Sequence, residues 1–459
     1  MSSKIFLFDD FYVASRPGTV RRYFKPEHLG LYLDGDHLQT YTTFFYDSRV
    51  GKYRLYYEIP ISDKSTEIRK LLLAEADTVE DFISGNVKKY EVEGLDPNGL
   101  HGCSVLLCTH EGRVANYVLG GNFRANNRNE RCMFTAKSED GIHFTDMKKI
   151  HEDYSDAYNS VYYNPHTEEY VMTMRAAIGD RRIFLIRSKD YENWSRPEML
   201  LHPVAYGNNG VQLYSMGVNE LDGMFYGVVW RFMTDLGYYD PKDMYGYMDC
   251  DLYYSYDGDH FMPTGLAPVC DRPLPPAAGC KQLWLLNTCH THDGRTILCG
   301  GASSVMHGGK MGQKKPMTTT FYGIRKDGFC AIEGLGETSR VYLKRMVCDG
   351  GNLALNFNAN LGQIKVAILN DRGIPYEGFD FEDCIPFANE ESTDKQVRWK
   401  NAELSSLKNK LIRVAFLLNG ALLYTVTVDA KPCPRHPQVS TGNPLPVTPI
   451  EHSYDLVGQ

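Results

Sequence analysis

The sequence predicts an all-β protein: a five-bladed β-propeller over residues 1–335, a β-sandwich over residues 340–430 and an extended tail over residues 431–459. Three observations predict this fold. The 459 residues include 31 Tyr, 21 Phe, 4 Trp, 41 Gly and 22 Pro, a composition typical of many short strands joined by turns. A hairpin pattern occurs five times, and a short box of residues recurs in phase with it.

Each hairpin consists of an apolar strand, a short polar turn and a second apolar strand. The segments TYTTFFYDSRVGKYRLYYEI and NSVYYNPHTEEYVMTMRA are two of the five. Gly, Asn or Asp between runs of β-forming residues is the usual signal of a tight turn. The five turns are expected near Asp47, His110, Asn164, Glu220 and His292. A third strand is expected after each hairpin, which gives three or four strands per repeat.

The recurring box closes each third strand. It begins with a small residue and ends six residues later with an aromatic one, and two copies hold Asp-Gly in the middle, which suits a tight turn. The copies are ADTVEDF from Ala76, SEDGIHF from Ser138, SKDYENW from Ser188 and SYDGDHF from Ser255, with a shortened RKDGF from Arg325. Repeats of roughly 50–70 residues with this content fit propeller blades. A pair of β-sandwiches is the alternative, but it does not explain why the box stays in phase with the hairpins.

The pattern changes after residue 340. The segments GGNLALNFNANLGQIKVAIL and KLIRVAFLLNGALLYTVTV alternate as strands do but lack the box. Such alternation predicts an antiparallel β-sandwich with its own core. From Lys431 onward the chain holds six prolines and few apolar residues, which predicts an extended tail on the surface.

The composition limits the partners and the compartment. Lys and Arg number 49 against 57 Asp and Glu, a net charge of −8, so the basic surface of a nucleic-acid binder is not expected. The apolar runs are shorter than the ~18 residues of a membrane span, and the N-terminus does not read as an export signal. The 12 cysteines form no C-x-x-C pair, so we expect a cytoplasmic protein with buried free thiols and no cofactor.

Several segments carry a resemblance to known enzymes: LFDDFYV, SDAYNSVYYNP, DYENWSRPEML and GFDFEDCIPF, followed by VRWK. They resemble family-32-like glycoside hydrolases, the group of invertases and levanases, and more distantly family 43, with its arabinanases and xylosidases. The resemblance implies a five-bladed propeller, a C-terminal β-sandwich and catalytic carboxylates from different blades. The invertase motifs W-M-N-D-P-N-G and R-D-P and the E-C pair are absent, so the resemblance does not define the sugar.

Propeller geometry predicts where a site would form. The first strands of all blades line one channel, so residues before first strands, at the ends of second strands and at the starts of third strands meet at one mouth. The residues before first strands are Asp36, Asp96 and Asp156, with Asp34 as an alternative to Asp36, and Gln212 and Gln282 in the last two repeats. The others are Glu58, Arg175 and Arg231 at second-strand ends and Asp249 at a third-strand start.

Cleavage of a glycosidic bond needs two carboxyl groups, one that protonates the leaving oxygen and one that activates water or attacks the sugar. The resemblance implies Asp36 as base or nucleophile, Asp96 as modulator and Asp156 as the acid, with Glu58 and Asp249 as substitutes. For each aspartate the alternative is a turn or capping residue. Asp36 and Asp156 would face each other across the channel, which favours inversion of the anomeric configuration.

Other residues near the mouth are candidate sugar ligands. Arg175 and Arg231 end apolar strands, so each guanidinium needs a carboxylate or a ligand. Tyrosines in the loop after Arg231 offer flat faces and hydroxyl groups that suit sugars. Pairing within the protein and packing within the loop are the alternatives. The predicted sugar ligands are Asn159, Arg175, Arg231, Asp249, Tyr238 and Tyr239.

Two further motifs predict ordinary structure rather than ligand sites. His290 and His292 share a strand face beside Cys289, but no third ligand follows at zinc spacing, so a strand-end pair is expected and no metal site is predicted. The segment HGGKMGQKKP over residues 307–316 is glycine-rich and basic but lacks the P-loop form. It predicts a loop, with a lid over an anionic substrate as the alternative.

The predicted function is hydrolysis of small oligosaccharides or glycosides, so the expected partner is a small carbohydrate. A glycoside phosphorylase of the same fold is one alternative, and its basic cluster would consist of Arg175, Arg231, Lys310 and Lys314. A propeller that binds sugar without cleaving it is another. Phosphate-dependent turnover separates the first two, and a pocket without paired carboxyl groups favours the third. A homo-oligomer is left open.

Overall fold

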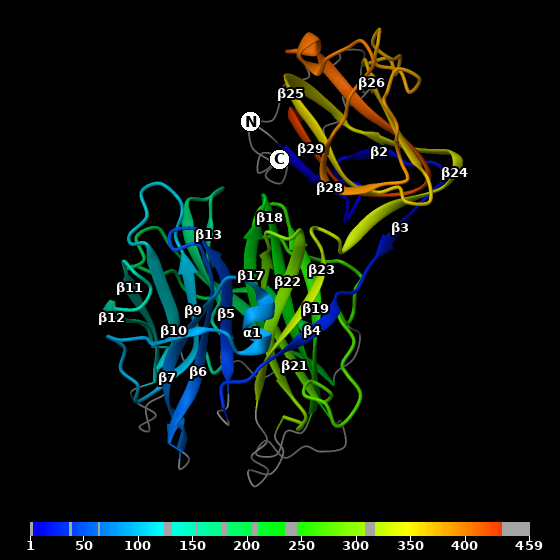
Figure 1. The fold of residues 1–459 in the computed structure, drawn as a ribbon. Helices are drawn as coiled ribbons and strands as arrows, with labels where there is room; N and C mark the ends of the chain where they lie inside the picture. The colour runs from blue at the N-terminus through cyan, green and yellow to red at the C-terminus, as the bar shows by residue number, and fades with distance from the viewer. Residues whose placement is uncertain are drawn as a thin grey trace. The chain divides into compact units, whose positions relative to one another are not determined.

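The computed structural model divides into two compact units, each described here by itself. One joins Met1–Phe24 to Arg325–Gln459, and the other is Lys25–Ile324. The structure describes residues 3–35, 39–62, 65–123, 131–152, 155–175, 181–203, 210–234, 246–307 and 317–433. Over these ranges the regular elements are strands, apart from one short α-helix and 3-10 turns (Figure 1). The all-β prediction is confirmed.

Three four-stranded antiparallel sheets follow one another in the unit Lys25–Ile324, each with its strands paired in chain order. The first holds β5 (Thr40–Asp47), β6 (Lys52–Ser62), β7 (Ser65–Ala76) and β8 (Lys88–Glu91). The second holds β9 (Leu100–Leu107), β10 (Tyr117–Phe123), β11 (Cys132–Ser138) and β12 (Phe144–His151). The third holds β13 (Val161–Asn164), β14 (Glu169–Met174), β15 (Ile183–Ser188) and β16 (Glu198–Leu201).

An eight-stranded sheet completes this unit and has two halves. One half is β17 (Val211–Leu221), β18 (Met224–Thr234), β19 (Gly246–Ser255) and β20 (Met262–Pro263). The other is β21 (Gln282–His290), β22 (Arg295–Ser303), β23 (Thr318–Arg325) and β4 (Glu27–Tyr32). One parallel pair, Met248 with Gln282, joins the halves. Because β4 precedes β5 in the chain, the last group of strands is completed by an N-terminal segment. All five predicted hairpin turns join a first strand to a second strand.

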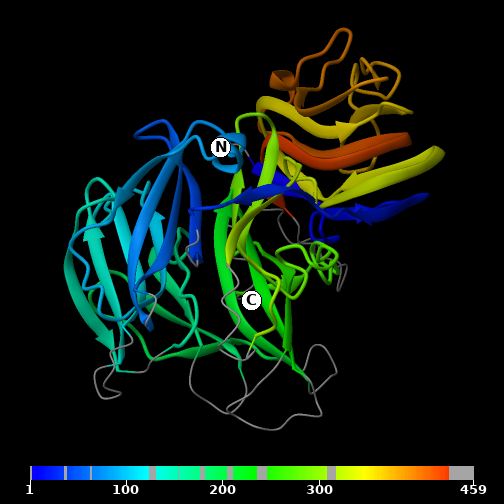
Figure 2. The ribbon, with the colours of Figure 1, turned by 60° about the horizontal axis from the view of Figure 1, so that its bottom comes forward.

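The first strands of the five groups form a closed cycle. β5 contacts β9 and β21, β9 contacts β13, β13 contacts β17, and β17 contacts β21. Figure 2 shows the groups succeeding one another in chain order, from blue to yellow-green. A hydrogen bond between a side chain and the backbone joins each neighbouring pair. Side-chain oxygens of Thr43, Ser104, Ser160 and Asn219 accept from Val105 N, Val161 N, Val218 N and Thr288 N, and Asn287 Nδ2 donates to Thr42 O. These polar side chains therefore close the cycle around its axis.

Three of the recurring boxes fold into the same turn. In each, a serine hydroxyl donates to the aspartate two residues later, at 2.9–3.1 Å. The same carboxylate oxygen accepts hydrogen bonds from the backbone N–H groups two and three residues after the aspartate, at 2.8–2.9 Å. The aspartates are Asp140, Asp190 and Asp257. The first box differs: its Thr78 caps the helix α1 (Val79–Ser84) by accepting from Asp81 N. The predicted box is thus a turn in which the aspartate side chain accepts hydrogen bonds from backbone N–H groups of the same turn.

Replacing Asp257 by Ala is expected to lower the free energy of unfolding by about 1–3 kcal/mol, because two backbone N–H groups of the turn lose their acceptor. Burial would raise the pKa of Asp257, but hydrogen bonds from the backbone of His260 and Asp259 outweigh it and hold the pKa below 3.8. A carboxyl group whose pKa is lower in the native state than in the unfolded chain stabilises the protein at a pH above its unfolded pKa. This stabilisation is lost as the pH falls through the native pKa. Urea unfolding at pH 7 and pH 3 should therefore show a smaller difference in the free energy of unfolding between the unmodified protein and Asp257→Ala at pH 3 than at pH 7. Exposed Glu111→Ala is the control, and an equal deficit in both variants would contradict the role.

The unit Met1–Phe24 with Arg325–Gln459 contains one nine-stranded, antiparallel sheet. Its N-terminal strands are β1 (Ser3–Phe6), β2 (Val13–Ser15) and β3 (Thr19–Tyr23). Its later strands are β24 (Cys330–Leu343), β25 (Arg345–Asn358), β26 (Gln363–Leu369), β27 (Phe387–Ala388), β28 (Glu391–Gln396) and β29 (Leu411–Cys433). A 3-10 turn covers Leu404–Leu407. Apolar side chains from all parts of the sheet form one separate core.

The expected boundaries differ from this division at both ends. The sequence predicts residues 1–24 as part of the propeller, but β1 pairs with β29 and β3 pairs with β24. Ile5 and Leu7 are buried in the core of that sheet, so apolar burial holds the segment there. The expected tail 431–459 begins inside β29, which extends to Cys433. Residues 434–459 lie outside the described part of the chain.

The expectation about the cysteines agrees with the structure. Every cysteine whose side chain is described is buried and free of disulfides. Cys289 and Cys299 pack in an apolar cluster, and burial raises the pKa of the Cys289 thiol to about 12. These thiols act as small apolar groups. Among the described residues, no helix has the length and apolar character needed to cross a membrane.

Candidate functional site

A pocket of about 260 Å³ opens where the first strands begin and the second strands end. It is walled by aromatic rings, with Arg69, Gln282 and His307 among its polar groups. Tyr41 and Trp230 lie nearly parallel with centroids 6.3 Å apart. The ring centroids of Trp230 and Trp284 are 6.1 Å apart. The lining residues are Tyr41, Arg69, Tyr214, Trp230, Met248, Gln282, Trp284, Leu286, Gly301, Met306, His307 and Met317. The mouth predicted from strand order is therefore hollow and aromatic.

Local structure fixes the aromatic wall. Trp230 is 2% exposed, and its Nε1 donates to the carbonyl of Leu285 at 2.6 Å, which anchors the indole ring to β21. Tyr41 stands at a bulge of β5 with φ 47°, in the left-handed region that residues other than glycine rarely adopt. Such strain is typical of binding sites, where the surrounding structure holds a side chain in place. The Tyr41 hydroxyl lies 3.2 Å from His101 Nε2.

Asp156 lies next to this wall and reaches solvent. Its side chain is 43% exposed, with Oδ1 3.3 Å from His101 Nε2 and Oδ2 3.3 Å from Arg175 Nη2. Arg175 Nη2 also donates to the backbone carbonyl of Asp156 at 2.6 Å, which fixes the guanidinium to the segment before β13. Two neighbours on different strands therefore orient an accessible carboxylate. The structure brings the predicted residues Asp156 and Arg175 together, and adds His101.

A second arginine lies on the same tyrosine as Arg175. The guanidinium of Arg175 is 4.5 Å from the ring centre of Tyr214, and that of Arg181 is 5.1 Å from it. Arg181 Nη1 donates to Gln212 Oε1 at 2.7 Å. The Tyr214 hydroxyl lies 3.3 Å from His307 Nε2. One side of the mouth is therefore both aromatic and cationic.

Glu58 is fully buried behind the pocket. Its Oε1 accepts from Cys103 N at 2.7 Å, and its Oε2 is 3.1 Å from Arg69 Nη1. Burial raises the pKa of Glu58, and the nearby Arg69 opposes that rise. Arg69 in turn lies 5.7 Å from the ring centre of Tyr41. Glu58 therefore positions a pocket residue rather than meeting a ligand itself.

The predicted residues Arg231 and Asp249 pair with each other. Arg231 Nε lies 2.8 Å from Asp249 Oδ1 and 3.1 Å from Asp251 Oδ1. Both aspartates stand on one face of β19, and both are nearly buried. Arg231 is opposite Asp249 in the register of β18 and β19, whereas Trp230 is opposite Cys250. Since side chains alternate along a strand, the ion pair lies on the face that Trp230 does not occupy.

Three other predicted residues have local structural roles. Asp96 is exposed, and its Oδ1 accepts from the backbone and side-chain amides of Asn98, which is a turn of the Asx type. Asn159 is fully buried and bonds to Thr173 O and to the side chain of Asn122, which ties strands together. The structure therefore places neither with Asp156 at the pocket wall. Asp34 accepts from Tyr57 and pairs with Lys89.

Other predicted residues lie outside the described part of the chain. Asp36 belongs to residues 36–38, and Tyr238 and Tyr239 belong to residues 235–245. Lys310 and Lys314 lie within residues 308–316. Their roles remain predictions from the sequence.

Sequence reasoning missed most of the aromatic wall, although a repeated signal was present. The motif Gln-x-aromatic opens three first strands, with its aromatic residue at Tyr41, Tyr214 and Trp284. In the third copy, Gln282 and Trp284 lie two apart on β21, so they share one face of the strand, and both line the pocket. The missed residues that line or flank the pocket are Tyr41, Arg69, His101, Arg181, Tyr214, Trp230, Trp284 and His307.

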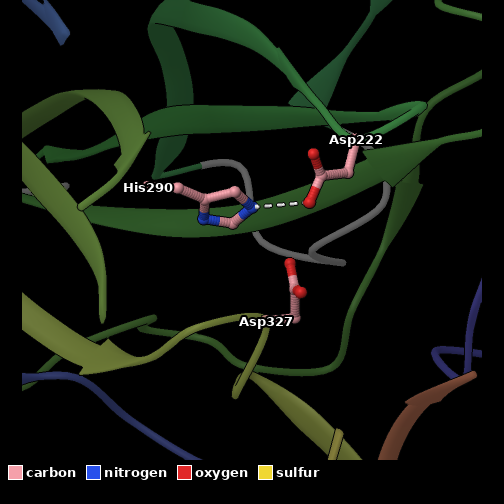
Figure 3. Close-up of side chains that lie close together, drawn as sticks. All are labelled: Asp222, His290 and Asp327. Carbon is pink, nitrogen blue, oxygen red and sulfur yellow. Dashed lines mark ion pairs between the residues drawn. The ribbon is translucent and has the colours of Figure 1, made fainter. Parts of the chain in front are cut away.

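The two histidines weighed as a metal site have different partners. His290 Nε2 lies 3.6 Å from Asp222 Oδ2 (Figure 3). Its Nδ1 lies 3.0 Å from Thr296 Oγ1. His292 instead packs edge-on against Tyr46, with ring centres 4.3 Å apart. Asp327, also labelled in Figure 3, belongs to the other unit, where it pairs with Lys4. His290 lines a second cavity of about 520 Å³ at the far ends of the first strands.

No protein-family model and no curated protein matches the chain. Among solved structures, it is similar to one described as a glycoside hydrolase, with 13% identity over 66% of this chain and 94% of that chain and a TM-score of 0.47. It is similar to a glycosyl hydrolase from Bacteroides ovatus (11% identity, 67% and 97% covered, TM-score 0.43). It is also similar to a mannose phosphorylase from Leishmania mexicana in complex with phosphate ion, with 12% identity over 66% of this chain and 88% of that chain and a TM-score of 0.41. Such values assign neither a family nor an activity, so the family 32 resemblance stays a prediction.

Proposed function

We propose that the protein cleaves glycosidic bonds of small saccharides at the channel mouth. One observation carries the proposal: a solvent-exposed, oriented carboxylate, Asp156, adjoins a pocket walled by aromatic rings. Aromatic faces pack against the C–H faces of sugars, and a carboxyl group exchanges the proton that bond cleavage requires. A pocket of about 260 Å³ suits one or two sugar rings.

The residues take distinct roles in this proposal. Asp156 transfers the proton, and His101 and Arg175 hold its carboxyl group in place. Gln282 is 5% exposed, and its Oε1 accepts no hydrogen bond from the described residues, so it is available to a sugar hydroxyl. Asp36 is retained as the second carboxyl group on sequence position alone, because it precedes β5 as Asp156 precedes β13.

We also propose the finer fold predicted from the sequence. The closed cycle of five first strands supports a five-bladed propeller in the unit Lys25–Ile324. The nine-stranded sheet with its own core supports a β-sandwich in the other unit. A crystal structure in which the first strands enclosed four or six blades would contradict the first proposal.

Cleavage by phosphate is a second candidate because the mouth is rich in arginine. Of the basic residues predicted for it, Arg175 lies at the site, while Arg231 is paired with Asp249 and Asp251. The structure adds Arg69 and Arg181. Phosphate as nucleophile needs such cations to offset its charge.

A panel of oligosaccharides and aryl glycosides, incubated with and without inorganic phosphate, tests the function. We expect cleavage of at least one compound, with free sugar as product if water is the acceptor and sugar phosphate if phosphate is. Proton NMR of the first product identifies the anomer, and we expect inversion. Binding is measured separately, since Trp230 and Trp284 make the pocket visible by fluorescence.

The outcomes separate the candidates. Sugar that quenches the fluorescence without being cleaved would favour the non-catalytic propeller. Trp230→Phe and Trp284→Phe assign the quenching to the pocket. If these variants remove it, the other two tryptophans, Trp194 and Trp399, are not its source. Neither binding nor cleavage across the panel would contradict the proposed function.

A further inference from the structure

The two arginines at Tyr214 form an unusual arrangement. Arg175 directly follows β14 and Arg181 precedes β15, which pairs with β14, and both arginines lie against the same ring. Both guanidinium groups are within about 5 Å of its centre, at 4.5 and 5.1 Å. The two guanidinium groups carry like charges, and Arg175 acts against the charge of Arg181. Burial, together with the charge of Arg175, lowers the pKa of Arg181.

Arg175 also has an unmet hydrogen-bond donor. The residue is 9% exposed, and its Nη2 is engaged by Asp156. Its Nη1 is buried and meets no acceptor among the described residues. An unsatisfied buried donor costs about 1–3 kcal/mol unless a ligand supplies the acceptor. The guanidinium fork therefore has one arm on the protein and one arm that remains available.

The carboxylates described near these arginines each have a cationic partner. Asp156 is shared between Arg175 and His101, and buried Glu58 is paired with Arg69. Asp249 and Asp251 are held by Arg231. The charged neighbours that influence Arg181 are Arg175, which opposes its charge, and Asp156, which supports it. An additional anion beside Arg175 and Arg181 would supply the acceptor and reduce the repulsion.

We propose that Arg175 and Arg181 form a subsite for an oxyanion that accompanies the saccharide. The anion is a carboxylate or phosphate carried by the sugar, or a free phosphate ion. Planar guanidinium groups bind such groups through paired N–H bonds, and the ring of Tyr214 keeps both arginines in place. The inference rests on the proposed function only in placing the saccharide in the same pocket.

Matched ligands test the subsite by tryptophan fluorescence and calorimetry on the full chain. Glucose is compared with glucuronate and glucose 6-phosphate, galactose with galacturonate, and inorganic phosphate is titrated alone. We expect the charged member of at least one pair, or phosphate alone, to bind about tenfold more tightly than the neutral sugar. Tighter binding of a charged sugar places the anion on the substrate, whereas binding of phosphate alone identifies a free ion.

Arg181→Gln should abolish this preference and leave the contacts of Asp156 in place. Arg181→Lys should restore part of it, since the charge returns without the fork. Arg196→Gln, an exposed arginine elsewhere, should keep the full preference. The ratio of two affinities in one sample does not depend on the fraction of folded protein, so partial unfolding does not obscure it.

The subsite and the proposed function fail in different ways. An unchanged preference in Arg181→Gln, or neutral sugars binding as well as charged ones, would overturn the subsite even if saccharides are cleaved. Anion-selective binding that disappears in Arg181→Gln would support the subsite even if no saccharide in the panel is cleaved.

Discussion

Replacing Asp156 by Asn is expected to lower kcat by about 10²–10⁴-fold while sugar binding persists. The amide keeps the size of the side chain, and its oxygen can still accept from Arg175 while its NH2 group faces His101 Nε2, so the geometry should survive. It cannot exchange the proton, and that loss affects the transition state more than the bound substrate. Steady-state kinetics on the best substrate of the panel gives kcat, and fluorescence titration gives the affinity.

Asp96→Asn is the matched comparison in the same assay. Asn can replace Asp in the turn that Asp96 makes with Asn98, so neither folding nor turnover should change by more than about twofold. A large loss of kcat in Asp96→Asn would restore the modulator role that the sequence predicted. If Asp156→Asn lost thermal stability but kept its activity per folded molecule, Asp156 would be structural and not catalytic.

Replacing Glu58 by Ala is expected to lower the free energy of unfolding by about 3 kcal/mol, the largest stability effect among these carboxylates. The change removes the buried partner of Arg69 and leaves Cys103 N without its acceptor. Urea unfolding followed by far-ultraviolet circular dichroism measures it. Glu58→Gln keeps an oxygen for Cys103 N and should be milder. If Ala and Gln had equal, small effects, the ion pair would contribute little.

The pH dependence of Glu58→Gln has a definite sign. Burial, opposed by Arg69, raises the native pKa of Glu58 above the ordinary value of 4.5. The native state therefore holds the proton more tightly than the unfolded chain, so the stability from Glu58 is full below about pH 4.5 and declines as pH rises through the native value. Gln does not ionise, so the free energy of unfolding that Glu58→Gln loses relative to the unmodified protein should be largest near pH 4.5. This loss should become smaller toward pH 8. A deficit that grows with pH would contradict the raised pKa.

Patterns that are local in the chain were predictable. The boxes at Ser138, Ser188 and Ser255 predicted a turn, and each folds into the same network because every donor and acceptor lies within five residues. The hairpin turns followed from the same kind of signal, since a turn residue and its flanking strands are neighbours in sequence. The all-β class rests on many such signals together.

The site was predictable only in part. Strand order alone indicated that Asp156 and Arg175 would meet, because both stand at the same ends of neighbouring strands. Arg181 and the ring of Tyr214 were not predicted, since their approach depends on how the strand β17 packs beside β14 and β15. Asn159 was predicted at the pocket three residues from Asp156, yet its side chain is buried between strands.

The amino-acid sequence by itself determined the strand content, the repeated turns and the end of the cycle where polar residues gather. The tertiary structure alone decided which sheet receives Ser3–Phe6, which face of β18 carries Trp230 or Arg231, and which carboxylate stays in contact with solvent. The physical reason is the range of the interactions. Turn chemistry is settled within a few residues, whereas strand pairing, burial and charge pairing join residues that are far apart in the chain, and their register sets every side chain's environment.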